Sequence, residues 1–502
     1  MKIKTSYLFA TTLLAAALMP ARALPQTQTP PSETQELRNL VEQMRVQMAK
    51  MQSQIDKLTG TEAPASPTQA ATTPTTPPAP PARQNGTIQT AEPARVGATS
   101  QHVGDATADY REFSEDTFAA ARFNNVPLDP KYQGFFQLPG TQTILKIGGY
   151  FKTDFIYDLK AAGNADSFIP SSFPIPQPVD VQNTTVSIRP TRLSLDFRVP
   201  YTKVGEVRFY LEGDFFGTTS TTPRLRHAYA QARNFLIGQT FTNFMDPDAF
   251  PDGLDFQGPN GMVSLRNPQF RYGVALNPST TFYISLEKPS SDVIFTTAQF
   301  TSQPEAPAPD GTVRLRKEFE RGHVQVAGLF RSIGAFVAPG PDQKTGSVFG
   351  WGINTSLGLN TFGRDNLIFA VAAGHGISRY IQDTSGLGID AEPASGVTTH
   401  LVATPAVGIE ASYQHYWTKR LRSSAIYSYA AVNNTDLAAL DTYNHATYTG
   451  TNLIWNPGGS LNVGAEFLYG WAMEQSGQKA NAPRIQFSAK YSFVKVDPPD
   501  SK

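Results

Sequence analysis

Four carboxylates stand close together between residues 243 and 261, in a segment rich in proline and glycine. They are Asp246, Asp248, Asp252 and Asp255. Proline and glycine favour stiff turns here, and four apolar residues could anchor the segment against a wall: Phe244, Phe250, Leu254 and Phe256. A fixed group of acids beside water attracts or repels small ions. The residue types therefore predict a segment that folds inward and narrows a pore.

Five arginines could supply the opposite charge, because each lies at a polar position of an alternating segment. They are Arg192, Arg198, Arg208, Arg226 and Arg271. Acids facing bases across a constriction would select ions by charge as well as by radius. The polar positions carry a modest excess of bases, which predicts a preference for small anions. The alternative is that these arginines form ordinary ion pairs with Asp196, Glu206 and Glu212.

Other chemistry has little support in the sequence. The chain has no cysteine, which removes disulfides, thiol nucleophiles and thiolate metal sites. Its histidines show no spacing typical of metal ligands, no serine stands in a nucleophile elbow, and there is no phosphate loop. We therefore expect no enzymatic activity, no cofactor and no metal. Lys+Arg and Asp+Glu balance at 42 each, so nothing indicates a nucleic-acid partner.

The elements that must position these charges lie between residues 143 and 493. Apolar and polar residues alternate there, as in the segment from Arg484 to Phe493, and period two is typical of a strand with two differently solvated faces. The pattern recurs about sixteen times, which predicts an all-β protein, a transmembrane antiparallel up-and-down β-barrel. A barrel of about sixteen strands is wide enough to leave an aqueous channel.

Connection lengths predict the topology, because outer-membrane barrels alternate short periplasmic turns with longer external loops. The expected short links lie near 200–203, 233–234, 277–279, 321–322, 362–366, 418–419 and 456–460. The expected longer ones lie near 159–183, 217–222, 243–262, 289–311, 333–346, 380–400, 433–442 and 474–483. An even number of strands puts both chain ends in the periplasm.

The chain opens with a predicted export signal. Residues 1–23 combine Lys2 and Lys4, a short apolar run and a small-x-small cleavage site at Ala21–Ala23. Export together with the alternating pattern predicts a protein of the bacterial outer membrane, surrounded by its lipid, with the N-terminal segment in the periplasm.

A short coiled coil is expected at residues 32–60, where apolar residues recur at alternating steps of four and three. Its seam comprises Leu37, Val41, Met44, Met48, Met51, Ile55 and Leu58. A linker rich in proline, alanine and threonine (61–104) and a lead-in (105–142) separate it from the barrel. The coil could support an oligomer or periplasmic contacts, and it leaves open an alternative function as a structural envelope tether or adhesin.

Five motifs resemble those of the DcaP-like outer-membrane porins. They are Gly134–Thr141, Lys146–Tyr150, Leu225–Tyr229, Asn243–Pro247 and Asp255–Gly261. The resemblance extends roughly over Arg122–Phe493 and implies a trimeric, sixteen-stranded porin with a periplasmic coiled coil. It also implies a constricting third loop and uptake of small, often negatively charged or dicarboxylic solutes. The tail Val494–Lys502 departs from the usual pattern, in which the barrel ends on an aromatic residue.

Overall fold

The computed structural model describes residues 132 and 134–493, except 219–220, 295–302, 338–343 and 395–396. The chain divides into two units, residues 1–92 and 93–502, and all described residues belong to the second. The expected signal peptide (1–23), coiled coil (32–60), linker (61–104) and tail (494–502) lie outside the described residues, as does most of the lead-in (105–142).

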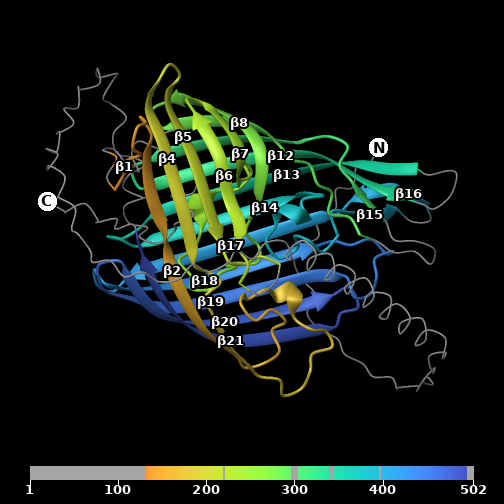
Figure 1. Cartoon of the computed structure of the whole chain (residues 1–502). Coiled ribbons are helices and arrows are strands. Elements are labelled where there is room, and N and C mark those ends of the chain that lie inside the picture. Colours follow the sequence, from red (N-terminus) through yellow and green to blue (C-terminus); the bar gives the residue numbers. More distant parts are fainter. Residues whose placement is uncertain are drawn as a thin grey trace, which may run out of the picture. The chain divides into compact units, whose positions relative to one another are not determined.

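Sixteen antiparallel strands form a closed barrel, as expected (Figure 1). They are β2 (Ile144–Asp158), β4 (Arg192–Thr202), β5 (Gly205–Asp214), β6 (Arg224–Ala232), β7 (Phe235–Phe241), β8 (Arg266–Asn277), β9 (Thr280–Glu287), β11 (Asp310–Phe319), β12 (Gly322–Val337), β13 (Lys344–Asn360), β14 (Asn366–His375), β17 (Pro405–Tyr416), β18 (Leu421–Val432), β19 (Tyr443–Gly458), β20 (Leu461–Glu474) and β21 (Lys479–Ser492). The barrel closes because β2 pairs with β4 over its first half and with β21 over its second half.

Three short strands pair with this wall, and a separate two-stranded hairpin and three 3-10 turns lie in the long loops. They are β1 (Phe136–Gln137), β3 (Asn183–Ser187), β10 (Gln303–Glu305), the hairpin β15 (Ala391–Ala394) and β16 (Val397–Ala403), and the 3-10 turns η2 (Pro170–Ser172), η3 (Pro247–Ala249) and η4 (Ser378–Tyr380). In the part of the chain that the structure describes, no helix is long and apolar enough to cross a membrane.

Short turns and longer loops alternate at opposite ends of the strands. Two of the expected loops were too long. Where a loop over 333–346 was expected, β12 continues to Val337 and β13 begins at Lys344. The link from β20 to β21 covers only residues 475–478, whereas a loop over 474–483 was expected. Residues 479–483 pair with β20 and continue its ladder. Their small polar and proline-containing sequence is typical of a loop, but Ala480 and Ala482 face inward and are fully buried.

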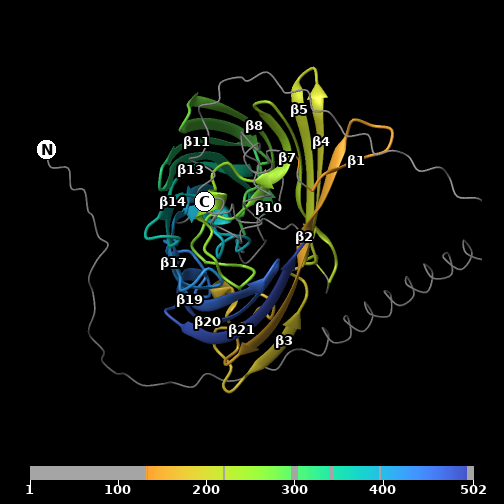
Figure 2. The same cartoon turned by 90° about the vertical axis from the view of Figure 1, so that its left-hand side faces the viewer.

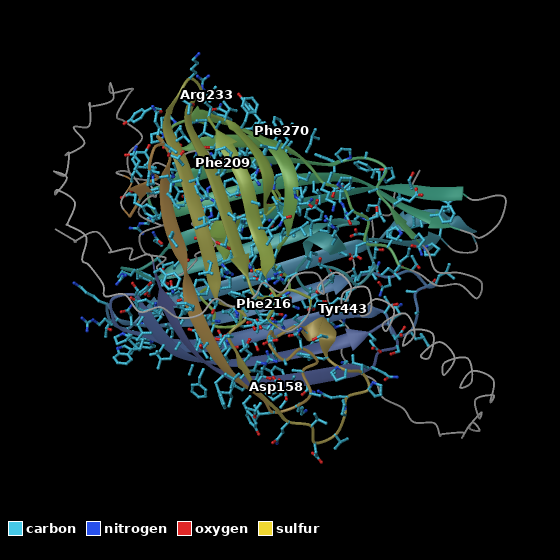
Figure 3. The ribbon with its side chains drawn as sticks, viewed as in Figure 1. Asp158, Phe209, Phe216, Arg233, Phe270 and Tyr443 are labelled. Carbon is cyan, nitrogen blue, oxygen red and sulfur yellow. The ribbon has the colours of Figure 1, made fainter. Side chains whose placement is uncertain are left out.

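The two faces of the wall carry different side chains because one meets hydrocarbon and the other the barrel interior. Phe209 and Phe270 lie on the outer face, 48% and 47% exposed (Figure 3). Their neighbours Arg208 and Arg271 point inward and are buried. A register shift after Glu212 interrupts this alternation on β6.

Three long loops meet inside the barrel at the end opposite the short turns (Figure 2). Phe168 packs edge-on against Tyr448 of the wall, and Phe244 packs edge-on against Tyr380. A single antiparallel bridge joins Val263 to Ile381. The loops are therefore held by an apolar core within the lumen.

Candidate functional site

The loop between β7 and β8, residues 242–265, runs along the inward face of the wall (Figure 2). Side-chain amides of the wall bind its backbone: Asn354 donates to the Phe244 carbonyl over 2.9 Å and Gln325 to the Met245 carbonyl over 3.1 Å. Farther along, the Gly261 amide donates to Ser428 over 2.8 Å. We call residues 243–261 the inner loop.

The first two acids of the inner loop meet bases on β11 and β12. Arg316 lies 3.0 Å from Asp246 and 2.8 Å from Asp248, and Nε2 of His323 lies 2.8 Å from Asp246. Burial alone would raise the pKa of the Asp246 carboxyl, but the charges of His323 and Arg316 hold that pKa well below its usual range.

Asp246, Asp248 and His323 offer three possible metal-ligand atoms within 4.8 Å of one another. Both carboxylates, however, already face the guanidinium of Arg316. The cluster therefore has the chemistry of an ion-paired anchor between the loop and the wall.

The other two acids of the inner loop have different environments. Asp252 accepts from Nε of Arg422 over 2.5 Å and from the Gln414 amide over 2.7 Å. Asp255 accepts from two backbone amides, those of Phe168 and Gly258, each over 2.9 Å. Burial raises the pKa of Asp255 to about 6, because nearby charges and these amides offset only part of the desolvation.

Glu466 on β20 fixes the same part of the loop from the wall. One of its carboxylate oxygens accepts from the amides of Leu254 and Asp255, over 2.9 and 2.7 Å. The Leu254 carbonyl accepts in turn from Lys152 over 2.5 Å and from Gln486 over 2.9 Å. Strands β2, β20 and β21 thus converge on one turn of the loop.

All five predicted arginines point inward and are at most 6% exposed. The ion pairs named by the alternative interpretation are present: Arg198 and Arg208 share Asp196, at 3.2 and 2.9 Å, and Arg226 lies 2.8 Å from Glu212. Arg198 also lies 3.4 Å from Glu206.

The remaining two predicted arginines have other surroundings. Arg271 donates to Gln269 and to the Phe241 carbonyl, and Arg192 lies over the rings of Tyr150 and Phe256 at 5.5 and 5.6 Å. The structure therefore places Arg192 beside the inner loop. Whether these five arginines and four acids control permeation stays a prediction.

Sequence reasoning missed the bases that the inner loop contacts directly. They are Lys152, Arg316, His323 and Arg422. Alternation does place Lys152 and Arg316 on inward faces. It does not predict which strands a long loop will contact, however. No local signal in the sequence would have selected them.

A cavity remains between the inner loop and the wall at the side of the short turns. It encloses about 1250 Å³ including its opening to solvent. Four bases line it, Lys152, Arg192, Arg422 and Lys490, together with two acids, Asp252 and Asp255. Tyr150 stands between two of the bases, with Arg192 at 5.5 Å and Lys490 at 5.0 Å from its ring. The cavity thus carries more positive than negative groups.

A closed sixteen-stranded barrel with an apolar outer face and a polar interior defines a channel of the bacterial outer membrane, a porin. The model of the DcaP outer membrane protein family matches residues 137–493, and the chain belongs to this family. No curated protein matches the chain.

Two solved structures illustrate the similarity. The outer membrane channel DcaP of Acinetobacter baumannii has 22% identity and a TM-score of 0.63, with 71% of this chain and 99% of that chain covered. An anion-selective porin from Comamonas acidovorans has 10% identity and a TM-score of 0.46, with 70% and 100% covered. The first of these likenesses confirms the fold.

Proposed function

We propose that the chain forms a water-filled channel for the passive diffusion of small hydrophilic solutes, narrowed by the inner loop and selective for small anions such as dicarboxylates. No covalent step is part of this function. The observation that carries the proposal is the cavity between loop and wall, where four bases face two acids. In a passage with low-dielectric walls, such an excess raises the local concentration of anions.

The position of the bases around the cavity supports the same sign of selectivity. Asp252 is paired with Arg422, and Lys152 is paired with Asp154 at 3.0 Å. Arg192 and Lys490 both lie over the ring of Tyr150, whose face attracts cations. An anion that passes the loop would therefore meet positive charge on the β2, β4 and β21 side.

The test is the reversal potential of single channels in a salt gradient, because its sign reports the preferred ion. We expect anion selectivity for the wild type. Lys490→Gln should lower the anion-to-cation permeability ratio roughly twofold, the effect expected of removing one partly exposed charge. Lys419→Gln is the matched control, since Lys419 is an exposed base in the short turn after β17. A strongly cation-selective wild type would contradict the anion preference.

Swelling of liposomes that contain the refolded chain separates the channel from a structural tether. Entry of solute supports the channel, and its absence supports the tether. The proposed assembly is a homotrimer with the coiled coil in the periplasm. Crosslinking of the chain with and without residues 32–60 tests whether the barrel wall alone holds the subunits together, as we expect.

A further inference from the structure

The chain just before β2 approaches the barrel from its interior. The hydroxyl of Tyr132 donates to Oε2 of Glu206 over 2.5 Å. The ring of Phe135 lies 5.2 Å from the guanidinium of Arg198 and 5.5 Å from Nζ of Lys146. These three wall residues occupy inward positions of β5, β4 and β2, near the end that carries the short turns. Tyr132 and Phe135 therefore lie on the lumen side of the mouth.

The local backbone presents the two rings together. Tyr132 and Gly134 both have left-handed φ values, 52° and 78°, and the Phe135 amide donates to the Tyr132 carbonyl over 3.1 Å. The rings then meet edge to face with centroids 5.9 Å apart. This tight turn makes one compact aromatic unit, which we call the mouth anchor (Tyr132 and Phe135).

The next residue leaves the lumen. Phe136 belongs to β1, pairs with Leu145 of β2 and is 49% exposed. Neighbouring phenylalanines thus have opposite orientations, Phe135 toward the bases of the lumen and Phe136 away from them. The contact of Phe135 with two cations is consequently a specific docking geometry and not general apolar packing.

The mouth anchor also affects the charges that it covers. Burial, and secondly the bond to Glu206, raise the pKa of the Tyr132 hydroxyl above its usual range, so that it stays a donor at neutral pH. Glu206 in turn lies 3.4 Å from Arg198, which is 3% exposed. A base so covered contributes less to the field in the passage than one facing water.

We propose that the mouth anchor is a built-in restriction of the channel: docked on Lys146, Arg198 and Glu206, it narrows the periplasmic mouth and masks two of its bases. This inference rests on the proposed channel function. The restricting element is part of the same chain, and it directly precedes β1.

The test compares full-length variants in single-channel recordings at low salt. The double variant Tyr132→Phe, Phe135→Ala should raise the conductance roughly twofold and increase the anion preference, because it uncovers positive charge at the mouth. Phe136→Ala is the matched control and should resemble the wild type. Unchanged conductance and selectivity in the double variant, or the same change in the control, would overturn the inference. A wild type that does not conduct would instead contradict the channel itself.

A second measurement tests directly whether residue 135 faces the passage. Because the chain has no cysteine, a single Phe135→Cys or Phe136→Cys can be labelled specifically. A charged thiol reagent added from the periplasmic side should change the current through Phe135→Cys and leave Phe136→Cys unaffected. Equal responses at the two positions would show that residue 135 does not face the passage.

Discussion

Arg422 on β18 donates a 2.5 Å hydrogen bond from Nε to the carboxylate of Asp252, which lies 170 residues earlier in the inner loop. The guanidinium is 3% exposed and the carboxylate 13%. This pair ties the middle of the loop to the wall opposite the strands from which the loop departs. The position of the loop in the lumen thus depends on an ion pair that neither segment could form alone.

Removal of that guanidinium should loosen the inner loop. We expect Arg422→Gln to lower the free energy of unfolding by about 2 kcal/mol, because it leaves a largely buried carboxylate without its charged partner. Single-channel currents should also become noisier. Arg420→Gln, at an exposed turn residue two positions away, should change neither property. In a double-mutant cycle, Asp252→Asn should add little to Arg422→Gln, and full additivity would contradict a direct pair.

Acidification should strengthen the contact of the inner loop with the loop that carries Phe168. Asp255 bridges the two, and burial raises its pKa from 3.8 to about 6. Because the folded-state pKa is raised, its contribution to stability is fully present below 3.8 and is lost as the pH rises through about 6. Thermal unfolding in detergent should show this loss between about pH 4 and pH 6, the interval between the unfolded and the folded pKa, with no further loss above it.

The matched variant for that pH dependence is Asp255→Asn. Its side chain cannot ionise, so its stability should not fall over the same pH range. Asp246 in the same loop is the internal comparison. Its pKa is depressed, so its contribution persists at neutral pH and is lost only as the pH falls below the usual aspartate range. If Asp255→Asn loses as much stability as the wild type with rising pH, another group must cause the loss.

A charge on the lipid face should destabilise the barrel according to depth. Phe270→Arg, within β8, should cost about 2 kcal/mol of folding free energy in lipid vesicles. Leu276→Arg, near the short turn that follows, should cost less than about 1 kcal/mol, because its side chain can reach the headgroups. Both native residues are exposed to the surroundings of the barrel. Urea unfolding of the two variants gives the comparison, and equal costs would contradict a hydrocarbon boundary at β8.

Deletion of Val494–Lys502 should leave a folded, heat-resistant barrel. The last described residue, Phe493, already completes the wall: its amide donates to the Gly149 carbonyl over 2.8 Å, and its ring packs edge-on against Phe151. A semi-native gel measures the folded band. Its loss in the truncated chain would show that the tail is needed for folding or assembly.

Much of the wall could be predicted from the sequence, because successive side chains of a strand point to opposite faces of the sheet. Phe209 outward and Arg208 inward follow from parity alone. The inward path of the inner loop was also predicted, from apolar residues such as Phe244 in an otherwise polar connection. The prediction was wrong where composition masked the strand pattern, as at residues 479–483.

Which charges meet was decided only by the tertiary structure. The sequence suggested that the acids of the inner loop would face bases such as Arg192 and Arg208, yet Asp246 pairs with Arg316 and Asp252 with Arg422. These partners are 70 and 170 residues apart. Closure of the barrel brings β11 and β18 close to a loop that follows β7. The local pattern of polar residues does not predict the course of that loop.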